Sequence, residues 1–244
     1  MNTLIKNTQI FNEGKCYQGD ILIKDDRIDK IDTQISVEVK CNEIDAEGLV
    51  LIPGIIDDQV HFREPGMMHK ATIGSESAAA IAGGVTSFME MPNTKPAATT
   101  IDLLEDKYNI ASKTSHANYS FYIGATNDNI ETIEKANYSK ICGIKAFMGS
   151  STGDLLVDDE TALEKLFKRA PALVATHCED EDRVKSRTSK FLERYDGNIP
   201  VQCHPIIRDE KACYLSSSKA VELAKKHNAR LHILHISTED EIQL

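Results

Sequence analysis

The sequence predicts an α/β fold preceded by a small β segment, and two patterns carry this prediction. Residues 1–52 hold short runs of alternating polar and apolar residues between turn signals, a pattern typical of strands. From residue 53 onward, apolar runs of four to six residues alternate with helix-like stretches, which indicates a parallel sheet covered by helices. We therefore predict a β segment over 1–52 and an α/β domain over 53–244.

The elements follow from these patterns in chain order. In the N-terminal segment we expect strands at Thr8–Phe11, Asp20–Lys24 and Arg27–Ile31. In the α/β domain the buried strands are predicted at Ile55–Phe62, Val85–Met91, Tyr119–Ala125, Ile144–Met148, Leu173–His177 and Leu231–Ile236. Helices are predicted between them at Ser75–Ala82, Ile101–Ser112, Asp159–Lys168 and Ser216–His227.

The spacing of the last two predicted strands is unusual. From His177 to His235 there are 58 residues, about twice the ~30 of a βα unit. The charged stretch 179–208 is poor in apolar residues. We interpret it as an excursion over the functional face, the alternative being a solvated loop and helix without a role.

Charge and composition narrow the classes of function. The 38 acidic and 28 basic residues give a net charge of −10, which repels phosphate backbones and anionic lipids. We expect a small-molecule substrate, and neither nucleic acid nor a membrane as a partner. No stretch approaches the roughly 18 apolar residues of a membrane span, no signal peptide is recognisable, and the six cysteines are irregularly spaced. These features predict a cytoplasmic, reduced protein.

Polar residues at the ends of the predicted strands carry the main functional signal. The residues concerned are His61, Asn93, Lys145, His177 and His235. The carboxyl ends of parallel strands are where barrels and open α/β sheets both place their chemistry. A single histidine at such a position is more often a hydrogen-bonded structural residue. Three of them converging would suit a zinc-type ion.

The first of these strands offers further oxygen donors. It reads Asp57-Asp58-Gln59-Val60-His61, and alternation places Asp57, Gln59 and His61 on one face. That face could hold a cation.

Lys145 lies within the apolar tract from Gly143 to Met148. Burial lowers the pKa of a lysine and leaves a neutral amine, which can react with carbon dioxide. The resulting carbamate could bridge two cations about 3.5 to 4 Å apart. The alternative is a lysine whose head reaches the strand end and stays in water.

Several tracts together resemble the amidohydrolase superfamily and, within it, the dihydroorotases. They are the lead from Gly48 into Asp57-x-Gln59-x-His61, the runs His61-Phe62-Arg63-Glu64-Pro65-Gly66, Met91-Pro92-Asn93-Thr94 and Gly143-Ile144-Lys145-Ala146-Phe147-Met148, and the two later histidines. The resemblance runs from the N-terminal segment to the last residue. It implies a (β/α)8 TIM-type barrel, with about six of eight strands present here, and a composite β-sandwich to which residues 1–52 contribute.

The same resemblance implies roles for individual residues. His61 would be a ligand of a first metal, and His177 and His235 ligands of a second. Lys145, carrying a carbamate derived from carbon dioxide, would bridge the two. Arg63 and Asn93 would hold the substrate carboxylate, Arg63 through a bidentate pair. The alternatives are a surface ion pair between Arg63 and Glu64, and a turn role for Asn93.

The cofactor implied is zinc, as one or two ions. The implied reaction is the reversible hydrolysis of dihydroorotate to N-carbamoyl-L-aspartate in pyrimidine biosynthesis, and we expect a homo-oligomer. Other candidates are a sister enzyme acting on hydantoin or allantoin, and a non-catalytic assembly partner.

Two departures from the family pattern bear on this. Gln59 stands where the family has a histidine, so we expect a weaker first metal site, with one tightly held ion or with Asp57 or Asp58 as substitute ligand. We also expect the chain to be the N-terminal part of a longer enzyme, without the catalytic aspartate at the end of the last strand. The acidic residues Glu239, Asp240 and Glu241 are instead expected at a helix start.

Overall fold

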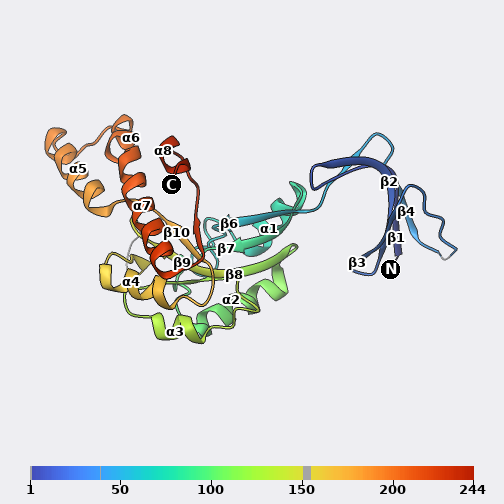
Figure 1. Ribbon diagram of the computed structural model, residues 1–244, viewed down its shortest axis with the longest axis horizontal. Helices are drawn as coiled ribbons and strands as arrows, with labels where there is room; N and C mark the ends of the chain where they lie inside the picture. The colour runs from blue at the N-terminus through green and yellow to red at the C-terminus, as the bar shows by residue number, and fades with distance from the viewer. Residues whose placement is uncertain (1, 39, 151–154) are drawn as a thin grey trace. The chain divides into compact units, whose positions relative to one another are not determined.

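The computed structural model describes residues 2–38, 40–150 and 155–244. Its contacts divide the chain into two compact units, Met1–Ile55 and Ile56–Leu244, which we describe separately (Figure 1).

The N-terminal unit is a mixed sheet. Its strands are β1 (Asn2–Asn12), β2 (Lys15–Lys24), β3 (Arg27–Asp32), β4 (Asn42–Asp45) and β5 (Val50–Leu51). The order is β3-β2-β1-β4, with β5 also paired to β1; β2 runs antiparallel to β1, whereas β4 and β5 run parallel to it. The three predicted strands are present. The sequence did not predict β4 and β5, because they are short and lack alternation.

The second unit is built on a parallel sheet of six strands. They are β6 (Ile55–Val60), β7 (Val85–Glu90), β8 (Asn118–Gly124), β9 (Gly143–Phe147), β10 (Val174–His177) and β11 (Leu231–Ile233). Neighbouring strands pair in chain order from β6 to β11. The pairs β7–β8, β8–β9, β9–β10 and β10–β11 are parallel. All six correspond to predicted strands. In-order parallel pairing requires a crossover between each pair, which the helices supply.

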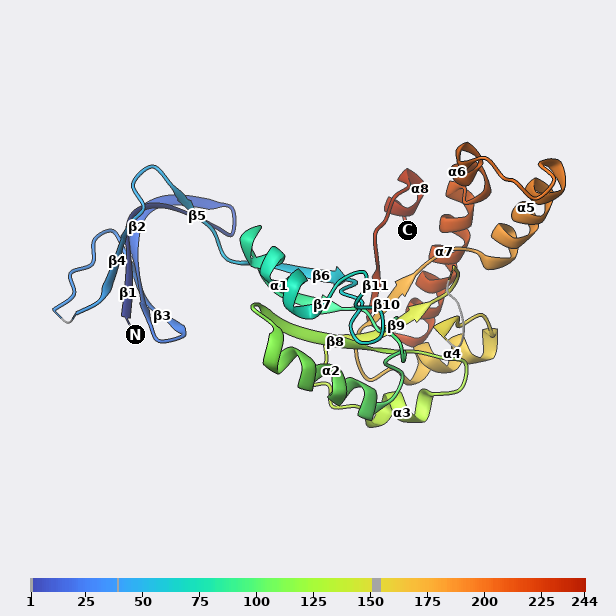
Figure 2. The same ribbon diagram turned by 180° about the vertical axis from the view of Figure 1, so that it is seen from behind.

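Helices connect the strands, and several of them cover the sheet (Figures 1 and 2). The helices are α1 (Ile73–Ala82), α2 (Ile101–Thr114), α3 (Ile130–Lys135), α4 (Glu160–Arg169), α5 (Glu181–Arg194), α6 (His204–Ile207), α7 (Glu210–His227) and α8 (Glu239–Ile242), with a 3₁₀ turn at Val201–Cys203. Helix α1 packs on β7, α2 on β8 and α7 on β11. Within the described residues, no helix is long and apolar enough to span a membrane.

Capping residues decide where the helices begin. The Thr72 side chain accepts a hydrogen bond from the Ser75 backbone N–H as part of a capping box at the start of α1. The side chains of Asp159 and Asp209 each accept one backbone N–H at the starts of α4 and α7. Helix α7 therefore begins at Glu210, six residues before the predicted start at Ser216. The helix ends at His227, and the next residue, Asn228, has the left-handed backbone (φ 52°) that commonly terminates a helix.

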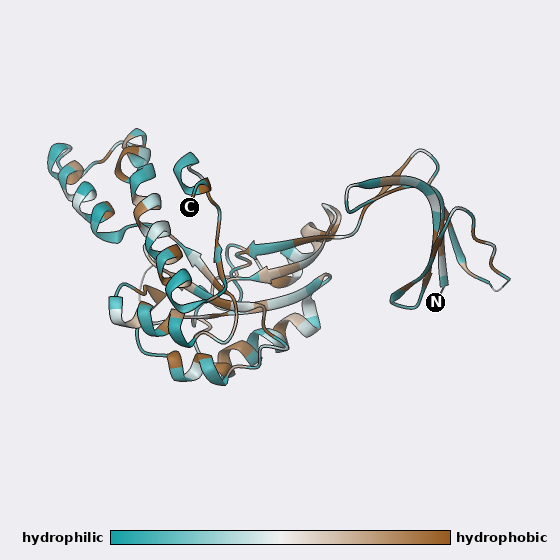
Figure 3. Cartoon of the chain, in the orientation of Figure 1, coloured by the Kyte–Doolittle hydropathy of each residue, from teal (hydrophilic) through white to brown (hydrophobic). Residues whose placement is uncertain are grey.

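The unusual stretch between β10 and β11 is helical rather than a plain loop. Helix α5 is largely hydrophilic (Figure 3). A small apolar cluster, separate from the main core, joins α5 and α6 to the start of α7. Its buried members are Val184, Cys203, Ile207 and Ala212. Part of the apolar surface of 179–208 is therefore buried within this stretch, whereas Leu192, Val201 and Ile206 stay exposed.

A buried ion pair joins strand β7 to helix α2. Glu90 ends β7 and Lys107 comes from α2, and each side chain is 1% exposed. Lys107 Nζ also donates to the Met91 carbonyl at 3.0 Å. Burial raises the pKa of Glu90 and lowers that of Lys107, while their mutual attraction acts in the opposite direction. No sequence pattern indicates this pair, because its members lie 17 residues apart in a strand and a helix.

We expect Lys107→Met to destabilise the fold by about 3 to 5 kcal/mol, because it leaves the Glu90 carboxylate buried without its cation. The loss should shrink as the pH is lowered. A carboxyl with a raised pKa in the folded state favours folding at low pH, and that contribution disappears as the pH rises through the folded-state value. Urea unfolding at several pH values measures both effects. The matched control is Lys219→Met, which removes the exposed partner of Glu160 and should change stability by no more than about 1 kcal/mol.

Candidate functional site

The ends of β6 and β7 bring two predicted residues together. His61 Nδ1 lies 2.7 Å from Asn93 Oδ1. Because the amide oxygen accepts, Nδ1 carries the proton and Nε2 keeps its lone pair. Asn93 also keeps its NH₂ group for another partner.

The two tracts that contain these residues pack on each other. The Lys95 backbone N–H donates to the Pro65 carbonyl at 3.1 Å. Gly66 has φ 86°, and a Cβ there would lie 1.9 Å from the Lys95 carbonyl oxygen. Only glycine permits this approach. The Pro-Gly of the first tract thus serves to dock it against the second.

Arg63 follows β6 with a left-handed backbone (φ 70°). Among the described residues no ion pair joins it to Glu64. The Glu64 carboxylate instead accepts the Ile73 backbone N–H at the start of α1, at 2.7 Å. The ion pair considered as an alternative for Arg63 is therefore not formed.

Lys145 is buried in the middle of β9. Its side chain is 1% exposed, and burial lowers its pKa from 10.5 to about 7. Nζ donates to the Ala146 carbonyl at 3.0 Å and lies 3.8 Å from the centroid of the Phe147 ring. The head does not reach water, so the alternative of a solvated lysine at the strand end is wrong.

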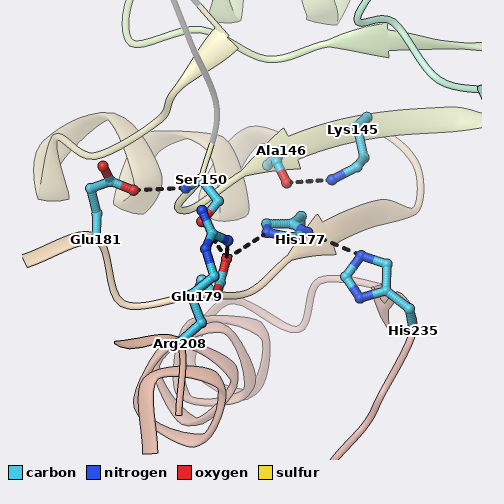
Figure 4. A network of polar contacts seen from close by, with 8 residues as sticks. All are labelled: Lys145, Ala146, Ser150, His177, Glu179, Glu181, Arg208 and His235. Carbon is cyan, nitrogen blue, oxygen red and sulfur yellow. Dashed lines mark hydrogen bonds and ion pairs between the residues drawn. The ribbon is translucent and has the colours of Figure 1, made fainter. Parts of the chain in front are cut away.

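His177 and His235 meet at the ends of β10 and β11. His177 Nδ1 lies 3.0 Å from His235 Nε2, and the ring centroids are 4.9 Å apart (Figure 4). Two nitrogens bound to one tetrahedral zinc lie about 3.3 Å apart. The pair therefore has close to the spacing of two ligands of one ion, with Lys145 on the adjacent strand β9.

Electrostatic effects connect the two halves of the site. Burial lowers the pKa of His61; the hydrogen bond that its Nδ1–H donates to Asn93 opposes this shift, and the charges of Arg63, Lys145 and His235 lower the pKa further. Burial also lowers the pKa of His235, and the neighbouring His177 adds to the effect. Both shifts favour the neutral imidazole, the form that binds metal ions.

The other candidate ligands on β6 have different partners. The Asp57 carboxylate accepts the Gln59 backbone N–H at 3.0 Å. Asp58 Oδ2 lies 3.1 Å from His232 Nε2. Among the described residues, no group of three or more His, Cys, Asp or Glu side chains is arranged to hold a metal ion.

Sequence reasoning missed a polar group beside His177. Glu179 is 6% exposed and contacts His177, Ser150 and Arg208 (Figure 4). Burial would raise its pKa, but the hydrogen bonds from His177 and Ser150 and the charge of Arg208 lower it to about 2. The available signal was alternation, which puts Glu179 on the same face as His177. Cys178, between them, lies in the core as alternation predicts.

The architecture agrees with that of known cyclic amidohydrolases. The L-hydantoinase (dihydropyrimidinase) of Arthrobacter aurescens superposes with a TM-score of 0.89 at 24% identity, over 99% of this chain and 54% of that one. A D-hydantoinase structure gives a TM-score of 0.86 at 26% identity, over 100% and 54%. The six-stranded sheet is therefore part of a TIM-type barrel, preceded by the N-terminal mixed sheet, as the sequence predicted.

Sequence comparison narrows this class. The family model for dihydro-orotase-like proteins matches residues 48–241. A dihydroorotase of Methanosarcina acetivorans is 34% identical over 245 residues, covering 98% of this chain and 50% of that protein, and one of Bacillus thuringiensis is 30% identical over 252 residues, covering 100% and 56%. The chain belongs to the dihydroorotase-like family of amidohydrolases. It spans about half the length of the relatives it matches.

Lys145 predicts a pH dependence of stability. A lysine whose pKa is lowered in the folded state favours folding at high pH, and this contribution is lost as the pH falls from the unfolded value through about 7. Relative to Lys145→Met, the wild type should therefore lose up to about 1.4 kcal/mol of stability per pH unit on going from pH 10 to pH 7. Urea unfolding of both proteins at pH 7 to 10 measures this. Parallel stability curves would contradict the buried, neutral amine.

Proposed function

We propose that this chain supplies the metal site and the substrate-carboxylate site of a dihydroorotase, which interconverts dihydroorotate and N-carbamoyl-L-aspartate. The observation that carries the proposal is the convergence of His177 and His235 to 3.0 Å beside the buried Lys145. Family membership supports it, as do the positions of His177 and His235 at or just beyond the ends of their strands and of Lys145 within the neighbouring strand β9.

Three residues would hold the tightly bound ion, for which zinc is the best match to nitrogen ligands at this spacing. His177 and His235 supply the two nitrogens. Lys145 would supply an oxygen donor as a carbamate. Its neutral amine nitrogen attacks the carbon of carbon dioxide, an N–C bond forms while the π electrons of one C=O bond move to oxygen, and the nitrogen gives its proton to water. A lysine with a pKa of about 7 has the neutral amine that this step needs. When bound, the metal would polarise the ring carbonyl and favour its hydrolysis.

We propose one tightly held metal ion per chain rather than two. On the opposite side of the site, His61 offers Nε2, while its neighbour Gln59 offers only an amide, a weak ligand for zinc. Asp58 is engaged with His232, and Asp57 with the Gln59 backbone. The second ion would therefore be held weakly.

Arg63 and Asn93 would recognise the substrate. Arg63 lies two residues after His61 and its charge lowers the pKa of that ring, and among the described residues no ion pair joins it to Glu64. The Asn93 oxygen is used by His61, which leaves its NH₂ group to donate. A guanidinium and an amide N–H group suit a ring carboxylate, which dihydroorotate has and hydantoin lacks. This contrast favours dihydroorotate over hydantoin.

The first test is hydrolysis of dihydroorotate by the protein at its full natural length, with zinc content measured in parallel. We expect turnover that depends on zinc, with one tightly held ion per chain. Lys145→Met should abolish turnover, whereas Lys140→Met, which changes an exposed lysine five residues earlier, should leave it intact. A folded protein that binds no zinc and turns over no substrate would instead indicate the non-catalytic assembly partner.

Arg63→Gln tests the substrate. Loss of a charge-assisted hydrogen bond costs about 1.5 to 3 kcal/mol, so KM for dihydroorotate should rise by about tenfold or more. Turnover of hydantoin, which has no carboxylate, should change little. Steady-state kinetics with dihydroorotate, hydantoin and allantoin separate the candidate substrates. The assignment would be contradicted if the wild type preferred hydantoin or allantoin and Arg63→Gln left KM for dihydroorotate unchanged.

A further inference from the structure

The two ring nitrogens of His177 have different partners. Nδ1 faces His235 Nε2 at 3.0 Å, while Nε2 lies 3.3 Å from Glu179 Oε2 (Figure 4). One side of the ring is thus turned to the position proposed for the metal and the other to a carboxylate.

Glu179 is itself held in place from two further directions. The Ser150 hydroxyl donates to Oε2 from the segment after β9, and the Arg208 guanidinium forms an ion pair with the same oxygen from the residue after α6. The segment after β9 approaches closely, because a Cβ on Gly149 would lie 2.1 Å from the Glu179 carbonyl oxygen. The carboxylate therefore has a fixed position rather than that of a mobile surface group.

This arrangement determines which nitrogen of His177 carries the proton. A carboxylate paired with an arginine can only accept hydrogen bonds, so Nε2 is the N–H donor; in the neutral imidazole, the form that binds a metal ion, Nδ1 then holds the lone pair. Histidine ligands commonly donate their second ring N–H to a carboxylate, which fixes both the tautomer and the orientation of the ring.

We propose that Glu179, held by Arg208, is a positioning residue for the metal site: it fixes His177 as the Nε2–H tautomer and aims Nδ1 at the position shared with His235. The proposal rests on the proposed function, because it concerns the same metal site. It also gives the excursion 179–208 a role, since Arg208 is its last residue and its side chain reaches back to Glu179 at the end of β10.

The alternative role for Glu179 is purely structural, as the ion-pair partner that docks the excursion. The two roles differ in what they predict for the ring of His177. A structural role leaves the tautomer and the metal affinity independent of Glu179, whereas a positioning role links all three.

The experiment combines long-range ¹H–¹⁵N NMR of the histidine rings with zinc affinity, measured by chelator competition in bicarbonate buffer. In the metal-free wild type, His177 should be the Nε2–H tautomer. Glu179→Leu should give a mixture of tautomers and lower zinc affinity by about 10- to 100-fold. The control Glu181→Gln alters a carboxylate that accepts the Ser150 backbone N–H at 2.7 Å and should change neither reading.

The outcomes separate this inference from the function on which it rests. A wild-type His177 with its proton on Nδ1 overturns the positioning role, and this reading needs no variant to fold. Equal zinc affinity of wild type and Glu179→Leu overturns it as well, while leaving the metal site intact. A wild type that binds no zinc overturns the metal site itself and the proposed function with it.

Discussion

Parallel, in-order pairing of β6 to β11 is the constraint on which the candidate site depends. Because all five neighbouring pairs of strands follow the chain order, residues that close successive strands meet at one edge of the sheet. His61, Lys145, His177 and His235 are far apart in the sequence and are brought together by nothing else. Each histidine alone has an ordinary structural explanation, and their convergence is what distinguishes a site from a set of strand ends.

Burial gives the chemistry its character. Lys145 lies within an apolar strand, and among the described residues no ion pair joins it to a carboxylate, so burial dominates its pKa. Lys107 is equally buried but is paired with Glu90. The two lysines thus differ in whether a charge partner offsets the cost of burial.

The histidines are oriented by neighbours outside the group of candidate ligands. Asn93 binds the Nδ1 side of His61, and Glu179 binds the Nε2 side of His177. The other nitrogen of His177, Nδ1, faces His235 Nε2 at 3.0 Å. These contacts come from the strand ends and the excursion, so the segment with the fewest apolar residues contributes directly to the geometry of the site through Arg208.

The sequence by itself determined the strand-end residues and the alternation of strands and helices, because buried strands need continuous apolar runs and helices need capping and periodicity. It also placed Cys178 in the core. Only the tertiary structure decided which side chains touch: the Glu90–Lys107 pair, the Glu179–Arg208 pair and the Asp58–His232 contact. Such pairings join residues 17 to 174 positions apart, and no local pattern records them, because they depend on how the crossovers fold back onto the sheet.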